Sequence, residues 1–579
     1  MEREFDVAIV GGGPAGSTAA CLLRKYDPQL RVLVLEKEQF PREHIGESQL
    51  PAVSGILHEM GCWDKVEAAN FPVKLGATFT WGADDECWDF DFYPVEDFRD
   101  EARPAKYAGQ RRFTAFQVER AIYDKILLDH ARELGCEVRE QTAVREVVRD
   151  GDACGGLKLD SGETVTARWY LDASGAAGLF RRSFEVGSDA PKELRNIAIY
   201  DYWNDARWAV EIGVGGTRIQ VRSLPFGWIW FIPLGPKRAS VGLVCPAEYY
   251  RQRGLGTEAL YLEALEAQPQ IKDLLSGATR EGVRTVKDWS HISDRLCGDN
   301  WMLIGEAAGF ADPILSAGLT VHQGSAREAA FTILEIERGE IDATWLKKAY
   351  DEKTRRNIRQ HIQFAQYWYA ANSRFTQLKE HCQKIAAEAG LSLKPQQAWS
   401  WLARGGFTNQ GLFDAKFGSF DFGSAKRLVE KFSGEAGGGA DFRFEKFNAF
   451  KLNLLGAKKT HLPDYQGGRV RRIECYERAG RILPITGFYE NMMRLLKVTG
   501  EGRKMLQLLA QNISAQFEPA SRPQALSDHM LTLEAMLEGG WVTGRYDKKL
   551  PPMPTTDKGG RTLRATEEGL KAIGRAAGS

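Results

Sequence analysis

Six residues near the N-terminus have the types and spacing needed to hold two linked phosphates: Gly11-Gly12-Gly13-Pro14-Ala15-Gly16. In a Gly-x-Gly-x-x-Gly loop of this kind, Gly11 permits a tight turn, Gly13 lets the backbone approach a pyrophosphate, and Gly16 lets a helix pack closely on a strand. A helix that begins after the loop presents the positive end of its dipole to the phosphates. The pattern therefore predicts a dinucleotide-binding loop.

The elements around the loop are those that such a site requires. Val7-Ala8-Ile9-Val10 is a β-branched run typical of a buried parallel strand, and residues 17–23 have the composition of a helix. A second strand, 32–35, ends at Glu36, about twenty residues beyond Gly16, where an acidic side chain would bind the adenosine ribose. The glycines alone are weak evidence, but with strand, helix and Glu36 in register they predict dinucleotide binding.

A tryptophan-bracketed hexapeptide, Trp228-Ile229-Trp230-Phe231-Ile232-Pro233, lies near the middle of the chain. By itself it is equally consistent with a buried, aromatic-rich strand. In a chain that also has the glycine loop, it resembles the flavin-dependent halogenases, a family within the flavoproteins similar to para-hydroxybenzoate hydroxylase. The resemblance implies that the indoles of Trp228 and Trp230 separate the flavin from the substrate chamber, so that halide is oxidised before an organic substrate can react.

A second segment, Phe310-Ala311-Asp312-Pro313-Ile314-Leu315-Ser316-Ala317-Gly318, fits the family's Phe-x-x-Pro-x-x-Ser-x-Gly pattern. The resemblance places this turn beside the halide and the isoalloxazine ring, with Ser316 as a catalytic residue and Ser316, Ala317 and Gly318 at the halide. Backbone amides of such a turn, next to a helix N-terminus, can form a concave site for an anion.

Lys74, within an apolar, strand-like segment at 73–82, aligns with the essential lysine of the same family. Hypohalous acid released at the flavin must travel and then meet the substrate in one orientation. A lysine ammonium can hydrogen-bond the acid and polarise the halogen, whereas a desolvated neutral amine can form a haloamine. Either route needs a lysine in a dry channel, so we expect Lys74 to be buried.

The segments that follow Glu36 favour FAD over NAD, because they resemble those of the hydroxylase-like flavoproteins. Pro41-Arg42 and Gly46-Glu47-Ser48 follow the ribose acid, Arg120 opens an expected helix at 121–134, and residues 170–175 look like a strand-end glycine turn. Residues 297–308 match the third flavin motif, although Glu306 stands where the family usually has aspartate. The glutamate keeps the acceptor and lengthens its reach by one methylene.

Asp288 lies in a segment similar to one in chloramphenicol-type halogenases, where an aspartate can lie against the dimethylbenzene edge of the flavin; an ordinary strand-end aspartate fits equally well. The expected cofactor-binding residues are Gly11, Gly13, Pro14, Ala15, Gly16, Glu36, Lys37, Arg42, Glu47, Ser48, Arg120, Asp288, Gly305, Glu306, Pro313, Gly318 and Leu319.

The resemblance implies a halogenase that uses FADH2, O2 and chloride or bromide. Only one strand–glycine loop–helix unit is found in the sequence, since Gly213-Val214-Gly215-Gly216 is followed by a strand, so a separate reductase would supply the FADH2. The alternatives are an FAD monooxygenase or polyprenyl-type reductase of the same fold, and a flavoprotein whose C-terminal module binds a carrier protein or regulator. An indole, a phenol or pyrrole, and a carrier-tethered acyl group all remain open as substrates, and a long C-terminal extension favours the last two.

Composition narrows the class of protein. The 579 residues include 77 basic and 77 acidic side chains, and this balance gives no reason to expect a nucleic-acid or membrane partner. Nine scattered cysteines form no Cys-x-x-Cys pair, and the nine histidines form no cluster with the spacing of a metal site. The charged N-terminus leads directly into a strand and no apolar run could span a bilayer, so we expect a cytoplasmic protein without a signal peptide.

The expected fold class is α/β (α+β overall), with a Rossmann-like FAD-binding domain, an interleaved substrate-side β-sheet and a mainly helical C-terminal extension. The core is expected over 1–350, with cofactor segments 1–70, 105–185 and 280–350 and sheet segments 71–104 and 186–279. Three parts are expected to follow: a helical and loop-rich connection (351–464), a helical module for which a winged-helix-like fold is one option (465–545), and a flexible tail (546–579). In longer halogenases resembling the chloramphenicol enzyme, such an extension covers the active site.

Overall fold

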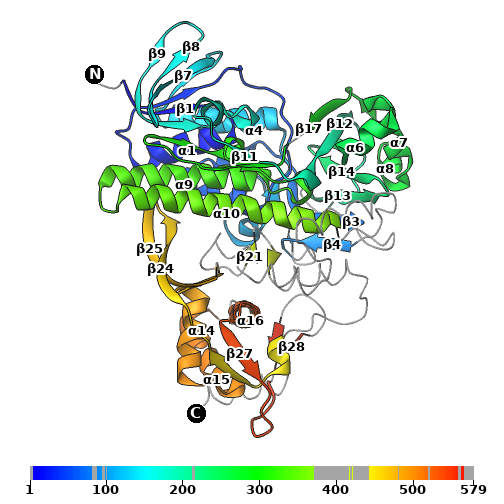
Figure 1. Cartoon of the computed structure of the whole chain (residues 1–579). Helices are drawn as coiled ribbons and strands as arrows, with labels where there is room; N and C mark the ends of the chain where they lie inside the picture. Colours follow the sequence, from blue (N-terminus) through cyan, green and yellow to red (C-terminus); the bar gives the residue numbers. More distant parts are fainter. Residues whose placement is uncertain are drawn as a thin grey trace. The chain divides into compact units, whose positions relative to one another are not determined.

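The computed structural model describes residues 4–80, 88–93, 98–99, 101–211, 215–287, 289–370, 416–417, 420–421, 443–479, 481–518, 522–553, 555–557 and 563–565 (Figure 1). The chain divides into two compact units. Unit 1 comprises Met1–Ala389 with Tyr465–Val470, and unit 2 comprises Gly390–Asp464 with Arg471–Ser579.

The first layer of unit 1 is a five-stranded parallel sheet with the order β19 (Trp301–Leu303), β10 (Ala167–Asp172), β1 (Phe5–Val10), β2 (Val32–Leu35) and β6 (Glu137–Arg139). Its central strands are apolar and buried, as expected for a sheet covered on both faces. The helices of this part of the unit are α1 (Pro14–Tyr26), α2 (Pro51–Met60), α3 (Trp63–Ala68), α4 (Arg120–Glu133), α5 (Leu179–Ser183) and α9 (Gly318–Arg338). This confirms the Rossmann-like FAD-binding fold.

The second layer is a nine-stranded sheet, which confirms the interleaved substrate-side sheet. Its main order is β16 (Thr279–Arg280), β12 (Asn196–Asn204), β15 (Arg238–Pro246), β14 (Gly227–Pro233), β13 (Gly216–Leu224), β3 (Val73–Thr80) and β4 (Trp88–Asp91), with β17 (Arg284–Lys287) paired to β12 and β5 (Ala115–Phe116) to β3. β3 runs parallel to β13, whereas the other pairs are antiparallel. The sheet therefore joins segments from distant parts of the sequence.

Alternation along β14 divides its side chains between two environments. Ile229 and Phe231 join a hydrophobic core with Leu260 and Tyr261 of α7 (Thr257–Glu266). Short helices α6 (Ala247–Arg253) and α8 (Pro269–Leu274) contribute to the same core. Because successive strand residues point to opposite faces, Trp228 and Trp230 lie on the face away from this core.

Two long helices follow the third flavin motif, and they lie side by side across unit 1 (Figure 1). They are α9 and α10 (Ala343–Ala370). The expected boundary at residue 350 falls inside α10, and β17 extends the substrate-side sheet a few residues beyond the expected limit of 279. Both differences arise because a helix or strand continues as long as its buried face has a partner, and periodicity alone does not show where the partner ends.

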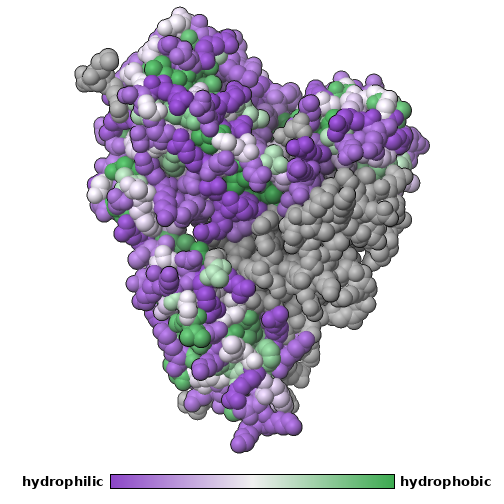
Figure 2. Space-filling view, in the orientation of Figure 1, coloured by the Kyte–Doolittle hydropathy of each residue, from purple (hydrophilic) through white to green (hydrophobic). Residues whose placement is uncertain are grey.

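Small sheets complete unit 1. One contains β7 (Val144–Asp150), β8 (Ala153–Leu159) and β9 (Thr164–Val165), and another contains β11 (Ser188–Asp189), β18 (His291–Ser293) and β20 (Gly309–Phe310). No helix among the described residues is long and apolar enough to cross a membrane. The described surface facing the viewer in Figure 2 is largely hydrophilic, with hydrophobic residues scattered over it.

Residues 458–484 depart from the helical module expected over 465–545; of these, Tyr465–Val470 belong to unit 1 and the others to unit 2. Strands β24 (Lys458–Gln466), β25 (Arg469–Arg478) and β26 (Arg481–Pro484) form an antiparallel sheet, and Gly467 (φ 55°) with Gly468 (φ 73°) closes the β24–β25 turn. Two successive residues with positive φ are typical of tight hairpins. This Gly-Gly pair is a signal in the sequence that the helical expectation overlooked.

Helices begin only after these strands: α14 (Gly487–Val498), α15 (Gly502–Gln516) and α16 (Arg522–Glu538). β27 (Val542–Arg545) then pairs with β23 (Ala449–Leu452), so the compact part of the unit begins well before residue 465. The flexible tail expected from 546 stays a prediction; at its start, the buried Asn448 amide donates to the carbonyls of Asp547 and Leu550. Strands β28 (Thr555–Asp557) and β29 (Leu563–Ala565) also pair, as do β21 (Lys416–Phe417) and β22 (Phe420–Asp421).

Candidate active site

The glycine loop has the close packing that its sequence predicts. Gly11 has a φ of 108°, and a β-carbon there would lie 2.3 Å from the Ala173 carbonyl oxygen. A β-carbon on Gly16 would lie 1.9 Å from the Gly11 carbonyl oxygen. These two glycines therefore hold helix α1, with Pro14 and Ala15 in its first turn, against the ends of β1 and β10.

Gly13 differs from its neighbours, because the space in front of it is open. A β-carbon on Gly13 would have the Arg42 guanidinium, 3.4 Å away, as its nearest neighbour. An open approach to a glycine at a helix N-terminus, with a cation beside it, fits a pyrophosphate.

Glu36 lies at the end of β2, as expected for a ribose acid. Its carboxylate oxygens accept hydrogen bonds from the Gly12 amide (2.7 Å) and the Glu38 amide (2.9 Å), and the side chain is buried. Lys37 is exposed and lies 3.6 Å from the Glu38 carboxylate. Glu36 thus holds the loop itself, while Lys37 points toward solvent.

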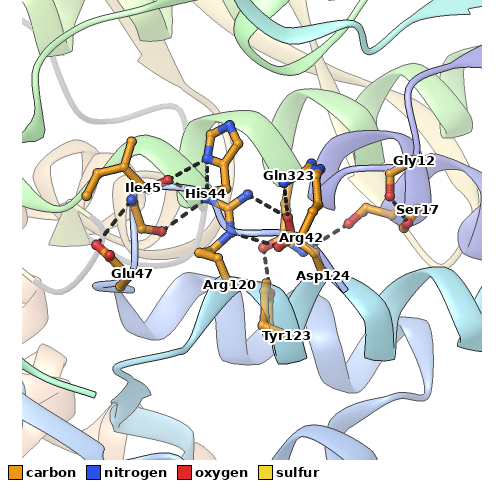
Figure 3. Close-up of polar contacts among 12 residues, drawn as sticks. Gly12, Ser17, Arg42, His44, Ile45, Glu47, Arg120, Tyr123, Asp124 and Gln323 are labelled. Carbon is orange, nitrogen blue, oxygen red and sulfur yellow. Dashed lines mark hydrogen bonds and ion pairs between the residues drawn. The ribbon is translucent and has the colours of Figure 1, made fainter. Parts of the chain in front are cut away.

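Arg120 holds the segment that leads to Glu47 and Ser48 (Figure 3). Its guanidinium makes two hydrogen bonds to the Asp124 carboxylate, at 2.7 and 2.9 Å, and donates to the Ile45 carbonyl at 2.7 Å. Arg42 lies on the same carboxylate, 3.3 Å from Oδ2. The geometry supports a role for Arg120 in fixing residues 45–46.

Next to Glu47, several buried side chains have polar atoms without a hydrogen-bond partner in the described part of the chain. Glu47 has a hydrogen-bond partner, since its carboxylate accepts from the Tyr202 hydroxyl at 2.9 Å. Burial raises the pKa of Glu47. In contrast, the Ser48 hydroxyl and the side-chain amides of Gln49 and Gln117 have no hydrogen-bond partner within the described part of the chain. Ser48 and Gln117 are paired by an antiparallel bridge. Buried polar groups are normally satisfied, so this cluster fits a bound polar group such as a flavin.

The third flavin motif meets the glycine loop and the strand-end turn. Gly305 has a φ of 61°, and a β-carbon there would lie 2.7 Å from the Ala15 β-carbon. Glu306 follows in the short helix η5 (Gly305–Ala307), 3.6 Å from the position of a β-carbon on Gly175. Burial raises the pKa of the Glu306 carboxyl. The three motifs that the sequence pattern linked to FAD therefore converge at one edge of the parallel sheet.

His322, which no sequence motif indicated, lies beside this convergence near the start of α9. Its β-carbon is 3.8 Å from the position of a β-carbon on Gly305. Burial lowers the pKa of His322 to about 3, and its Nε2 has no hydrogen-bond partner in the described ranges. The neutral imidazole is a further group that can donate to or accept from a bound cofactor.

Lys74 is buried in β3, as the resemblance implied. Its side chain is 1% exposed, and Nζ lies 5.3 Å from the centre of the Phe92 ring. No hydrogen bond or ion pair joins Nζ to another described residue, and burial lowers the pKa of Lys74 from 10.5 to about 7. The strand register shifts directly after the Lys74–Thr217 pair, a β-bulge of the kind that re-aims side chains near active sites.

Replacing Lys74 with methionine is expected to stabilise the protein most below pH 7. In that range both the folded and unfolded states hold the proton, so the folded state bears the full cost of a buried ammonium. Between about pH 7 and 10.5 the unfolded state binds more protons, stability of the wild type rises with pH, and the advantage of the variant shrinks. At about 1.4 kcal/mol per pKa unit, the change is on the order of 4 kcal/mol.

Urea denaturation of both proteins at pH 6 and pH 9.5 measures this difference. The exposed Lys348 on α10 provides the control, since Lys348→Met removes a solvated charge and should give the same small change at both pH values. An advantage for Lys74→Met that is equal at the two pH values would show that its pKa is not lowered.

The two tryptophans form a buried aromatic wall on one face of the same sheet. Trp228 is 2% exposed and Trp230 is 6% exposed, with their rings 6.0 Å apart at 54°. The Trp230 indole donates to the Ser240 hydroxyl at 3.1 Å and covers Gly242, where a β-carbon would lie 2.2 Å from the ring. Glycine at position 242 therefore provides the space for this indole.

The turn expected at the halide is formed as a short helix, η6 (Pro313–Leu315), that leads into α9. Asp312 caps it by accepting from the Ile314 amide at 3.0 Å, and burial raises the Asp312 pKa to about 6. Ser316 has a left-handed backbone, with φ 57°, and Gly318 is the first residue of α9, followed by the buried Leu319. The Ser316 amide donates to the Pro313 carbonyl at 2.9 Å and is therefore not available to a halide. The amides of Ala317 and Gly318 lie at the positive end of a long helix.

Asp288 lies outside the described residues. No group of three or more His, Cys, Asp or Glu side chains in the described part of the chain could hold a metal ion. Seven of the cysteines are described, and all seven are free: Cys21, Cys62, Cys136, Cys154, Cys245, Cys297 and Cys475.

Fold and site together define an FAD-dependent oxidoreductase in which a tryptophan wall and a buried lysine occupy one sheet. Comparison with known proteins gives the same class. The family profile named Tryptophan halogenase matches residues 6–107 and 98–400. The chain belongs to this family, the flavin-dependent halogenases.

Individual proteins that are similar to this chain are also described as halogenases or chlorinases. A tryptophan 2-halogenase from Chondromyces crocatus is 37% identical over 345 residues, which cover 58% of this chain and 62% of that enzyme. A 1H-pyrrole-2-carbonyl-[peptidyl-carrier protein] chlorinase from Pseudomonas fluorescens is 33% identical over 392 residues, covering 65% of this chain and 86% of the chlorinase. The solved structure of the flavin-dependent halogenase CmlS has a TM-score of 0.69 at 26% identity and covers 97% of this chain and 99% of its own.

Proposed function

We propose that this protein is an FADH2- and O2-dependent halogenase that delivers hypohalous acid through Lys74 to an electron-rich or carrier-tethered substrate. The observation that carries the proposal is Lys74 itself, a buried lysine with a pKa lowered to about 7. A protein rarely buries a lysine without a charged partner unless the group has a task.

The cofactor would be held by Gly13 and Arg42 at its pyrophosphate, by Glu36 at the adenosine ribose and by Glu306 near the ribityl chain. The unsatisfied side chains of Ser48, Gln49 and Gln117 would bind polar atoms of the ring system. When bound, reduced FAD with O2 supplies the oxidising equivalent that converts chloride or bromide into hypohalous acid. We propose that a separate flavin reductase provides the FADH2.

The protein's own residues would control where that oxidant goes. Amides of Ala317 and Gly318 would bind the halide, with Ser316 shaping the turn, and the wall of Trp228 and Trp230 would keep organic molecules from the flavin. Lys74 would then hold the hypohalous acid by a hydrogen bond from its ammonium or as a haloamine on its neutral amine. A pKa near 7 makes both forms available at neutral pH.

Two kinds of substrate, a free amino acid and a carrier-bound aromatic group, remain open, because the similar enzymes are named for different substrates. The Chondromyces enzyme is named for tryptophan and the Pseudomonas enzyme for a pyrrole carried on a peptidyl-carrier protein. The similarity to CmlS extends over nearly the whole chain, including its C-terminal part. Because a long C-terminal extension favours a phenol, a pyrrole or a carrier-tethered substrate over free tryptophan, we propose a substrate of that class. We propose that the protein acts in secondary metabolism in the cytoplasm.

One assay tests the function. Purified protein is incubated in air with FAD, a flavin reductase, NADH and either bromide or chloride. An electron-rich phenol serves as the trap, and the masses of the products are measured by mass spectrometry. We expect a halogenated phenol whose mass follows the halide supplied. An oxygenated product that forms without halide would instead identify a monooxygenase, and reoxidation of FADH2 without any product would indicate a binding flavoprotein.

A further inference from the structure

A chain of hydrogen bonds connects the tryptophan wall to the turn before α9. The Trp228 indole Nε1 donates to the Tyr369 hydroxyl at 2.8 Å, and that hydroxyl donates to the Asp312 carboxylate at 3.1 Å. The three residues come from β14, α10 and the start of η6. Three segments far apart in the sequence thus meet at one hydroxyl group.

The direction of each bond is fixed by chemistry. An indole nitrogen can only donate, and an ionised carboxylate can only accept. The Tyr369 hydroxyl is the one member that can do both, so it must accept from Trp228 while it donates to Asp312. Phenylalanine at this position would fill almost the same volume, yet it would leave a buried indole N–H without this acceptor.

Asp312 is well placed to anchor the chain. Its carboxylate is 3% exposed, and it also accepts from the Ile314 amide at 3.0 Å and the Trp289 indole at 3.4 Å. The Ile314 contact forms part of the same turn that leads to Ser316 and Gly318. A shift of Asp312 would therefore move the turn, and a shift of the turn would move the hydroxyl that holds Trp228.

We propose that Tyr369 is a positioning residue for halogenation: it fixes the plane of the Trp228 indole and couples the tryptophan wall to the turn expected at the halide. The proposal rests on the proposed function for its catalytic consequence. A loosened indole would let water or organic molecules approach the oxidant, and more of the O2 consumed would then appear as hydrogen peroxide.

Tyr369→Phe tests the proposal. The share of consumed O2 released as hydrogen peroxide should rise several-fold relative to halogenated product. FAD affinity should stay within about twofold, because the Tyr369 hydroxyl bonds Trp228 and Asp312, neither of which is an expected cofactor-binding residue. Trp228→Phe, which removes the same N–H, should show a similar rise. The double variant should be less impaired than the sum of the two single effects, because both changes break the Trp228–Tyr369 hydrogen bond.

Tyr350→Phe is the matched control. Tyr350 lies on the same helix, is buried, and donates to the Leu303 carbonyl at 2.7 Å, in a hydrogen bond that involves neither Trp228 nor Asp312. It should lower the melting temperature about as much as Tyr369→Phe while leaving the ratio of peroxide to product unchanged. Equal ratios for the two tyrosine variants, or additive effects of Tyr369→Phe and Trp228→Phe, would overturn the proposal.

Melting temperatures of the four proteins in the Tyr369–Trp228 cycle, measured without FAD, separate this inference from the proposed function. Coupling between the two positions should appear there as a loss of melting temperature in the double variant that is smaller than the sum of the losses in the two single variants. An assay that finds no halogenation at all would refute the function, whereas independent melting shifts would refute the hydrogen-bonded chain.

Discussion

Lys74→Met should lower formation of halogenated product by roughly 100-fold or more, the usual contribution of a positioned proton donor or acceptor. Consumption of O2 and reoxidation of FADH2 should continue at close to the wild-type rate. The physical reason is that the lysine acts after the oxidant has formed, and the side chain is buried away from the glycine loop in a different sheet. Product yield per FADH2 oxidised, measured by chromatography alongside an oxygen electrode, gives the result directly.

Lys348→Met is again the control, because Lys348 is exposed on α10 and should leave the yield unchanged. A Lys74→Met protein that halogenates at the wild-type rate would make Lys74 a structural residue. The pH dependence of the wild-type product yield then distinguishes the ammonium form of Lys74 from the neutral amine. Yield that falls as pH rises through about 7 indicates the ammonium, whereas yield that rises over the same range indicates the neutral amine.

Gly13→Val should weaken FAD binding by at least about 100-fold, equivalent to roughly 3 kcal/mol, without unfolding the protein. Gly13 has φ −67° and ψ −175°, a conformation that valine adopts readily, and its β-carbon would meet only the flexible end of Arg42. The branched side chain would instead occupy the place of the pyrophosphate. Titration with FAD measures the affinity, and the melting temperature without FAD measures the fold.

Gly16→Ala provides the contrast. Its added methyl group would overlap the Gly11 carbonyl, 1.9 Å away, so this variant should lose stability even without cofactor. Overpacking of this kind typically costs about 1–3 kcal/mol. If Gly13→Val lowers the flavin-free melting temperature as much as Gly16→Ala does, position 13 is structural and the pyrophosphate assignment loses its support.

Local rules account for the parts of this protein that could be predicted from the sequence. The glycine loop, its flanking strand and helix, and Glu36 at the end of β2 follow from hydrophobic periodicity and from the backbone freedom of glycine, both of which act over a few residues. The hairpin at Gly467-Gly468 obeys equally local rules. Its inclusion in the expected helical module rests on the periodic apolar residues at 506–513 and 531–537, which lie far from the turn in the sequence. Family resemblance added Lys74 and the tryptophans.

By itself, the sequence determined the parallel sheet with its glycine loop, the strand containing Trp228 and Trp230, and the flavin motifs in order, because each depends on neighbours along the chain. Only the tertiary structure decided that Lys74 has a pKa near 7, since that value comes from burial by residues distant in sequence. It also decided that Arg120 holds the carbonyl of Ile45, and that Tyr369 lies between Trp228 and Asp312. A tyrosine near the end of a long helix shows no local pattern for this role, because hydrogen bonds between distant segments depend on how sheets and helices pack, and packing has no period in the sequence.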